Sequence, residues 1–223
     1  MGWKVSMVII ENPENIIDDT SILKAIRKGN YTFEDRVSLE NCIHPRDNSI
    51  SIGKYNGNII ICDDFQLTTN SLESAEGLDL TTEEENLCKL FPNSEIVQVA
   101  CHSTVNYHGY SLIKNGEKVR LKIITSETPI IEFGERVYEE EILYSKSYQK
   151  DGVNYWSDEF DPNEEYLEDQ LMEDFTFGIA KRRLGVTLDR GDGEELMEKV
   201  TFNKYKKEDI SFFQRILNIF SSF

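Results

Sequence analysis

The sequence of 223 residues is poor in the features that cross-link, anchor or export a chain. It has no C-x-x-C pair, and no run approaches the roughly 20 apolar residues that a membrane-spanning helix needs. The N-terminus lacks the long apolar core and the small-residue cleavage site of a signal peptide. We therefore expect a cytoplasmic protein with reduced thiols at Cys42, Cys62, Cys88 and Cys101.

Positive charge is also scarce, and its deficit is uneven along the chain. The sequence has 24 Lys and Arg against 41 Asp and Glu, a net charge of −17. Residues 127–174 hold 16 acidic and 3 basic residues, a net of −13, and the other 25 acidic and 21 basic residues give −4. Such a chain repels the phosphates of bare nucleic acid and attracts a basic protein or a divalent cation. The alternative is that residues 127–174 are only a solvated surface that keeps the protein soluble.

Apolar residues, in contrast, are plentiful enough for a sizeable core. Hydrophobic residues make up 39% of the chain and aromatic residues 11%. A chain of this length and composition needs neither a disulfide nor a metal to hold its fold, and its aromatic content argues against disorder. We expect no cofactor and no metal. The Gly-rich segment 189–195 lacks the ligand spacing of a calcium loop and is interpreted as a turn.

Several strands and turns can be read directly from the sequence. Residues 3–10 are a predicted strand, because apolar residues recur at every second position: Trp3, Val5, Met7 and Ile9. Residues 96–101 are also predicted as a strand, because they form a short apolar run. Three dipeptides favour the positive φ angles of a type I′ turn and predict β-hairpins: Asn56-Gly57, Asn115-Gly116 and Asp151-Gly152.

Helix signals lie between the predicted strands. A short helix is expected with Thr20 or Ser21 as its N-cap, and a second begins with a capping box formed by Thr81 and Glu84. A longer third helix is predicted to begin at a cap on Asp161, to have Pro162 in its first turn and Glu164 in a capping box, and to end at Gly185. Its buried face is predicted to carry four apolar residues: Leu167, Leu171, Phe175 and Ile179.

The C-terminus carries the densest apolar segment of the chain. Seven of the large apolar residues in segment 210–223, from Phe212 to Phe223, cover more than half of a helix's circumference, so we predict a C-terminal amphipathic helix within residues 207–223. It is expected to dock on its own domain, on a second copy to give a homodimer, or on another protein. A membrane surface is disfavoured, since Arg215 is the only cation in residues 210–223. The predicted fold is a single α+β domain over residues 1–223, with a largely antiparallel or mixed sheet and flanking helices.

Several of these elements resemble an uncharacterised family of small bacterial α+β proteins, a domain of unknown function. The hairpin over residues 51–62 is similar to the family's first hairpin, and residues 97–105 resemble its central strand, which ends in His-Ser and an apolar residue. Residues 115–120 and 131–135 resemble its second hairpin and a following Gly-Glu corner. The resemblance implies an α+β fold, but the family has no assigned activity, substrate or cofactor.

One cluster could carry catalysis. His102 can act as a base near neutral pH, and Ser103 can be a nucleophile when a base activates it. Adjacent strand residues point to opposite faces, however, so His102 and Ser103 are not expected to meet, and His102 is predicted to be structural. The candidate catalytic residues are His102, Ser103, His108, Asp63, Asp64 and Glu135, with Cys101 beside them.

Two classes of function remain open. The absence of a catalytic motif, the concentrated acidity and the aromatic C-terminus favour a non-enzymatic bacterial binding protein that neutralises or chaperones a basic protein, as an immunity protein does against a basic toxin. The alternative is a hydrolase-type enzyme with a pocket around His102, which requires the candidate side chains to converge. The predicted partner-binding residues are Glu139, Glu140, Glu141, Asp158, Glu159, Phe212, Phe213 and Phe220.

Overall fold

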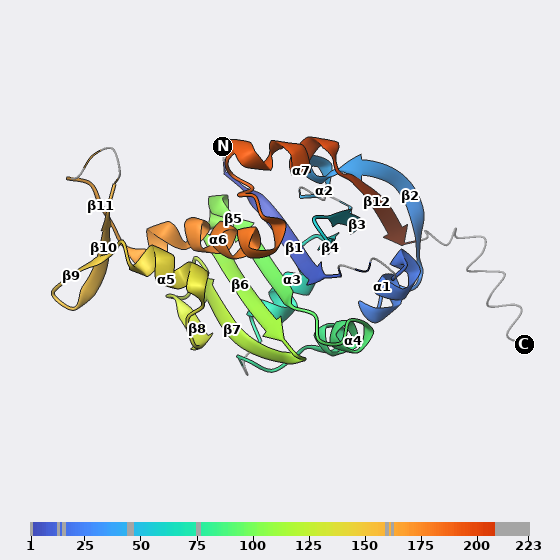
Figure 1. Ribbon diagram of the computed structural model, residues 1–223, viewed down its shortest axis with the longest axis horizontal. Coiled ribbons are helices and arrows are strands. Elements are labelled where there is room, and N and C mark those ends of the chain that lie inside the picture. The colour runs from blue at the N-terminus through green and yellow to red at the C-terminus, as the bar shows by residue number, and fades with distance from the viewer. Residues whose placement is uncertain are drawn as a thin grey trace, which may run out of the picture.

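The computed structural model describes residues 2–12, 14, 17–43, 47–74, 77–158, 161 and 163–207. Within these residues, nine strands form one sheet in which all neighbours are antiparallel (Figure 1). The predicted α+β class and antiparallel sheet are thereby confirmed. In spatial order the strands are β2 (Tyr31–Ser38), β12 (Thr201–Lys207), β3 (Ile50–Tyr55), β4 (Asn58–Cys62), β1 (Lys4–Glu11), β5 (Ile96–His102), β6 (Tyr107–Lys114), β7 (Glu117–Ile124) and β8 (Ile131–Gly134).

The three predicted hairpins are confirmed, and their turns have the expected backbone. Asn56 and Gly57, which join β3 to β4, have φ angles of 47° and 70°. The turn between β6 and β7 and the turn after β9 (Tyr148–Lys150) also have two successive positive φ angles. A type I′ turn needs this pair of angles and matches the twist of the two strands, so local sequence sets the register of each hairpin.

Helices cover both faces of the sheet, and its central strands are therefore buried on both sides. Residues of one parity, such as Val5 and Cys101, pack against one helical layer, and their neighbours, such as Val8 and Ala100, pack against the other. Figure 1 shows α6 crossing β5 and β6 on the near side. The near layer contains α2 (Leu39–Cys42), α5 (Tyr138–Tyr144), α6 (Met172–Leu184) and α7 (Glu194–Lys199), and the far layer α1 (Asp19–Ala25), α3 (Gln66–Leu72) and α4 (Thr82–Leu90). No helix within the described part of the chain is long and apolar enough to cross a membrane.

The capping box of α4 is confirmed, whereas the predicted N-cap of α1 is wrong. Thr81 and Glu84 each accept a hydrogen bond from the other's backbone N–H. In α1 the cap is Asp18, whose Oδ1 accepts a hydrogen bond from the Ser21 backbone N–H at 2.9 Å. Thr20 and Ser21 already belong to the first turn, because the earlier aspartate satisfies the free backbone donor.

The corrected cap predicts different effects for two neighbouring substitutions. Asp18→Ala is expected to lower the free energy of unfolding by about 1 kcal/mol, because the Ser21 backbone N–H loses its acceptor. Thr20→Ala, at an exposed position of the same turn, is expected to change it by less than about 0.5 kcal/mol. Urea unfolding of both variants measures the difference. Equal losses would contradict the assignment of the cap to Asp18.

The start of the third predicted helix is also wrong. Helix α6 begins at Met172, and the residues before it form β11 (Glu165–Tyr166) and a 3-10 turn, η2 (Glu168–Leu171). Tyr166 pairs with Trp156 of β10 (Val153–Ser157), so a tertiary contact replaces the local helix signal. The predicted end is confirmed, since Gly185 caps α6 with a φ of 78°. Pro162 lies outside the described residues.

Strands β9, β10 and β11 form a second, small antiparallel sheet. Figure 1 shows this sheet projecting from the end of the body beside α5. We call residues 147–166 the arm. Trp156 anchors it, since the indole is buried in the core and its Nε1 donates to the Leu143 carbonyl at 2.8 Å. The predicted C-terminal helix over 207–223 lies almost wholly outside the described residues, which end at Lys207 in β12.

Candidate functional site

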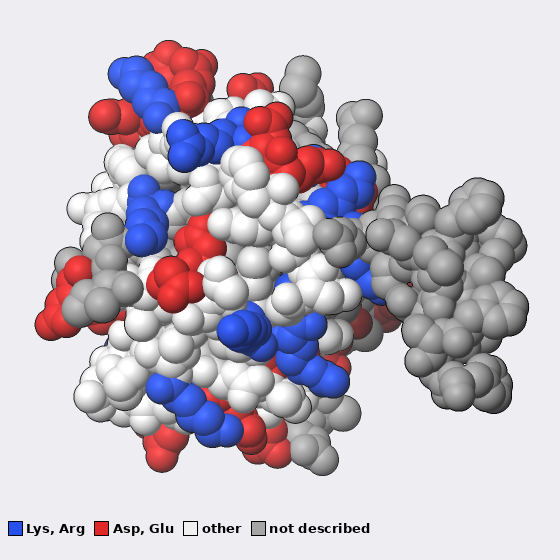
Figure 2. Space-filling model, turned by 90° about the vertical axis from the view of Figure 1, so that its right-hand side faces the viewer, with Lys and Arg blue, Asp and Glu red and all other residues white. Residues whose placement is uncertain are grey.

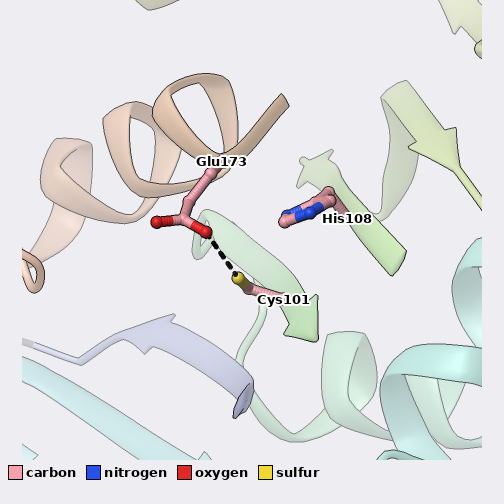
Figure 3. A group of neighbouring side chains, drawn as sticks. All are labelled: Cys101, His108 and Glu173. Carbon is pink, nitrogen blue, oxygen red and sulfur yellow. Dashed lines mark hydrogen bonds between the residues drawn. The ribbon is translucent and has the colours of Figure 1, made fainter. Parts of the chain in front are cut away.

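Four polar side chains converge where β5 and β6 meet the first turn of α6. Cys101 and His108 are direct cross-strand partners, and Ser103 follows at the end of β5. Glu173 reaches down from α6 onto the same face of the sheet (Figure 3). One potential ligand atom from each of Cys101, His108 and Glu173 lies within 4.8 Å of the other two. The sheet register and the packing of α6 thus create the cluster.

Hydrogen bonds hold Glu173 in this position. The hydroxyl of Ser103 donates to Glu173 Oε2 at 2.5 Å and accepts a hydrogen bond from the Trp3 backbone N–H at 3.1 Å. The Cys101 Sγ lies 3.8 Å from the same carboxylate oxygen, a weak sulfur contact. The Ser103 proton is therefore directed to a carboxylate, and the serine positions Glu173.

Burial controls the protonation of the two groups on the strands. Burial raises the pKa of the Cys101 thiol to about 12. The hydrogen bond with Ser103 lowers this pKa, and the negative charge of Glu173 raises it further. Burial lowers the pKa of His108 against the opposing effect of Glu173. At neutral pH the pair is thus a thiol beside a neutral imidazole, which is not the thiolate of a nucleophilic cysteine.

His102 lies on the opposite face of the sheet from this cluster. Its ring packs against Phe65, with centroids 5.8 Å apart, and burial and the charge of Lys4 both lower its pKa. Ser103 instead contacts Glu173. The sequence-based expectation that His102 and Ser103 do not meet is confirmed, and a structural role for His102 remains a prediction.

The three predicted carboxylates do not join either histidine. Asp63 is buried and accepts hydrogen bonds from the Ser6 hydroxyl at 2.6 Å and from the Leu67 backbone N–H at 2.7 Å. Asp64 forms an ion pair with Lys4 at 3.5 Å, and Glu135 is exposed after β8. The arrangement of base and carboxylate that the hydrolase alternative requires is therefore not formed by these residues.

Glu173 is the member of this cluster that sequence reasoning missed. It lies in a helix more than 60 positions after His108, and no spacing in the sequence connects the two. Its membership of the acidic segment 127–174 concealed it among the other 15 acidic residues. The long-range packing of α6 on β5 and β6 is what identifies it.

The acidic segment is only partly a solvent-facing surface, which corrects one expectation. Glu140, a predicted partner-binding residue, is fully buried and forms an ion pair with Arg120 at 2.6 Å. Glu139 is half-buried and pairs with Arg182 at 2.8 Å, and Glu168 neutralises the buried Lys122. These acids balance internal bases, so they are not free to bind a partner.

The remaining predicted partner-binding residues differ in how far the structure describes them. Glu141 is exposed, and Asp158 is half-buried and accepts a hydrogen bond from the Tyr166 hydroxyl at 3.1 Å. The others, Glu159, Phe212, Phe213 and Phe220, lie outside the described residues.

Compared with known proteins, the chain matches no family model, no curated protein and no solved structure. The segments that carry the resemblance to the bacterial family of unknown function fold as β3–β4, as β5 with the 3-10 turn after it, as the turn into β7, and as β8. Membership of that family stays a prediction.

Proposed function

We propose that the chain is a non-enzymatic cytoplasmic protein that binds a basic protein and thereby neutralises or chaperones it. The observation that carries this proposal is the arm, which combines acidic and aromatic side chains on a sheet that projects from the body (Figure 1). The acids that balance internal bases, Glu139, Glu140 and Glu168, lie just outside the arm in the sequence. A second group of acidic residues lies on the arm itself.

The second group supplies negative charge without an internal counterion. Residues 147–166, the arm, contain 6 acidic residues and 1 basic residue, a net of −5. At the end of the molecule away from the arm, acidic and basic side chains are interspersed (Figure 2). Asp151, Asp161 and Glu164 are exposed, and within the described residues none of them forms an ion pair with Lys or Arg. Uncompensated surface charge accelerates association with a partner of opposite sign and selects against acidic partners.

The aromatic side chains supply contact area next to this charge. Tyr148 stacks on Tyr155 with centroids 6.2 Å apart, and Val153 beside them is exposed. Tyrosines are enriched in protein interfaces because a rigid ring buries a large area with little loss of side-chain entropy. The buried Trp156 fixes the arm to the core, so the surface is formed before binding.

A charge-neutralising variant of the arm tests the proposal. The full chain captures its partner from an extract of the native cells, and the affinity of the purified partner is then measured at low and at physiological salt. Asp151→Asn, Asp161→Asn and Glu164→Gln together are expected to weaken binding about tenfold, since three surface charge pairs of 0.2–1 kcal/mol are removed. Wild-type affinity is also expected to fall as salt shortens the Debye length to about 8 Å.

The matched control removes three charges elsewhere. The control variant combines Glu194→Gln, Glu195→Gln and Glu198→Gln, three positions on the exposed side of α7. It changes the net charge by the same amount as the arm variant. Their combination is expected to leave affinity within about twofold of wild type, because distant rim charges contribute little at physiological salt. A partner whose binding is indifferent to salt, or equally weakened by both triple variants, would contradict a docking surface on the arm.

A further inference from the structure

We propose that Cys101, His108 and Glu173 bind one Zn²⁺ ion between β5, β6 and α6. This site is independent of the proposed function, because it lies on the sheet and not on the arm. Figure 3 shows the imidazole of His108 and the sulfur of Cys101 pointing toward the carboxylate of Glu173. The three side chains come from three elements. Cys101 in β5 and His108 in β6 are paired across neighbouring strands, and Glu173 comes from α6, far later in the sequence.

The ligand set and its spacing fit zinc. A sulfur, an imidazole nitrogen and a carboxylate oxygen are its usual ligands, whereas Mg²⁺ and Ca²⁺ take oxygen alone. Bond lengths of about 2.0–2.3 Å place tetrahedral ligand atoms ~3.3–3.7 Å apart. The Cys101 Sγ and Glu173 Oε2 are 3.8 Å apart, and all three ligand atoms lie within 4.8 Å. Rotamer adjustments of about 1 Å therefore close the site.

Two features of the described residues point to a cation: an unpartnered nitrogen on His108 and an uncompensated charge on Glu173. His108 is 6% exposed, and its buried Nδ1 has no hydrogen-bond partner within the described part of the chain. Buried imidazole nitrogens normally have such a partner, because a buried polar atom without a hydrogen bond costs about 1–3 kcal/mol of stability. Glu173 is half-buried, and among the described residues it forms no ion pair with Lys or Arg. A divalent cation coordinated by His108 Nδ1 and the Glu173 carboxylate would supply both missing interactions.

Neighbouring residues hold a ligand side chain in place before the metal binds. Ser103 donates to Glu173 and is itself fixed by the Trp3 backbone N–H, so the carboxylate is oriented from outside the ligand set. When zinc binds, the Cys101 thiol releases its proton to solvent and the sulfur coordinates as thiolate. Three protein ligands leave one position of the tetrahedron for a solvent molecule. The ion links α6 to the sheet and is expected to stabilise that contact.

Titration of the full chain with ZnCl₂ and CoCl₂ after treatment with a chelator tests the site. We expect one Zn²⁺ per chain by elemental analysis and calorimetry, a rise in melting temperature, and a near-ultraviolet thiolate-to-cobalt charge-transfer band with Co²⁺. Cys101→Ala, His108→Gln and Glu173→Gln are each expected to weaken Zn²⁺ binding by at least tenfold, and Cys101→Ala to abolish the cobalt band.

Two matched controls keep the residue types constant. His102→Gln removes the neighbouring histidine on the other face of the sheet, and Cys88→Ala removes a half-buried thiol of α4. Both are expected to bind Zn²⁺ as the wild type does. Loss of binding in His102→Gln but not in Glu173→Gln, no cobalt–thiolate band in the wild type, or no stoichiometric zinc would each overturn the site. The wild-type cobalt spectrum decides the question even if Cys101→Ala or His108→Gln fails to fold.

Discussion

Arg120→Ala is expected to lower the free energy of unfolding by about 3–5 kcal/mol, the typical effect of removing one partner of a buried ion pair. Arg120 is 1% exposed, and its Nε and Nη2 donate to the two oxygens of Glu140, at 2.9 and 2.6 Å. Its Nη1 donates to the carbonyl of Gly134 in β8 at 2.9 Å. Without the guanidinium, the fully buried Glu140 keeps an uncompensated charge and β8 loses a contact to the sheet.

Denaturant unfolding measures this loss against two controls. Lys89→Ala removes an exposed pair with Glu85 in α4 and is expected to change stability by less than about 0.5 kcal/mol. The double variant Arg120→Met with Glu140→Leu replaces both charges by apolar groups and is expected to recover most of the loss. If the double variant is as unstable as Arg120→Ala, the uncompensated charge of Glu140 is not the cause.

Phe202→Ala is expected to lower the free energy of unfolding by about 3–5 kcal/mol, the usual effect of truncating a buried aromatic residue. Phe202 of β12 is fully buried and lies opposite Gly53 of β3. A Cβ built on Gly53 would lie 2.5 Å from the Phe202 ring, so the ring occupies the space above the glycine. Its removal leaves a cavity in the core above Gly53, on the face of two paired strands that are distant in sequence.

A double-mutant cycle separates this packing from general destabilisation. Gly53→Ala alone is expected to cost about 1–3 kcal/mol, because the methyl group overpacks the core against the ring. In the Phe202→Ala background the same substitution is expected to be neutral or stabilising, since the added methyl group enters the cavity and alanine restricts the unfolded chain. Additive effects of the two substitutions would show that Gly53 and Phe202 do not share this space.

Signals within a few residues predicted the structure well. The dipeptides at the hairpin turns and the Thr81 capping box depend on backbone angles and donors that local sequence determines. The predicted start of α6 is wrong, because Tyr166 pairs with Trp156 and no local sequence pattern indicates this contact. Strand β12 was not predicted either, because its sequence is mostly polar and only Phe202 is fully buried.

The candidate site shows the same limit. Strand periodicity placed His102 and Ser103 on opposite faces, and it holds Cys101 and His108 in neighbouring strands. It gave no information on Glu173, whose position depends on how α6 packs. Conversely, Asp63 and Glu140 looked available in the sequence, yet the structure buries both with hydrogen-bond partners.

The position of β12 constrains the order in which the chain can fold. This strand, residues 201–207, lies between strands formed by residues 31–38 and 50–55, and within the described residues it is the strand partner of β2. During synthesis β2 and β3 therefore emerge long before the strand that joins them, and β3 is left with an open edge that can pair with other chains. Because the late contacts span about three quarters of the chain, we expect slow folding, completed only after residue 207 has left the ribosome.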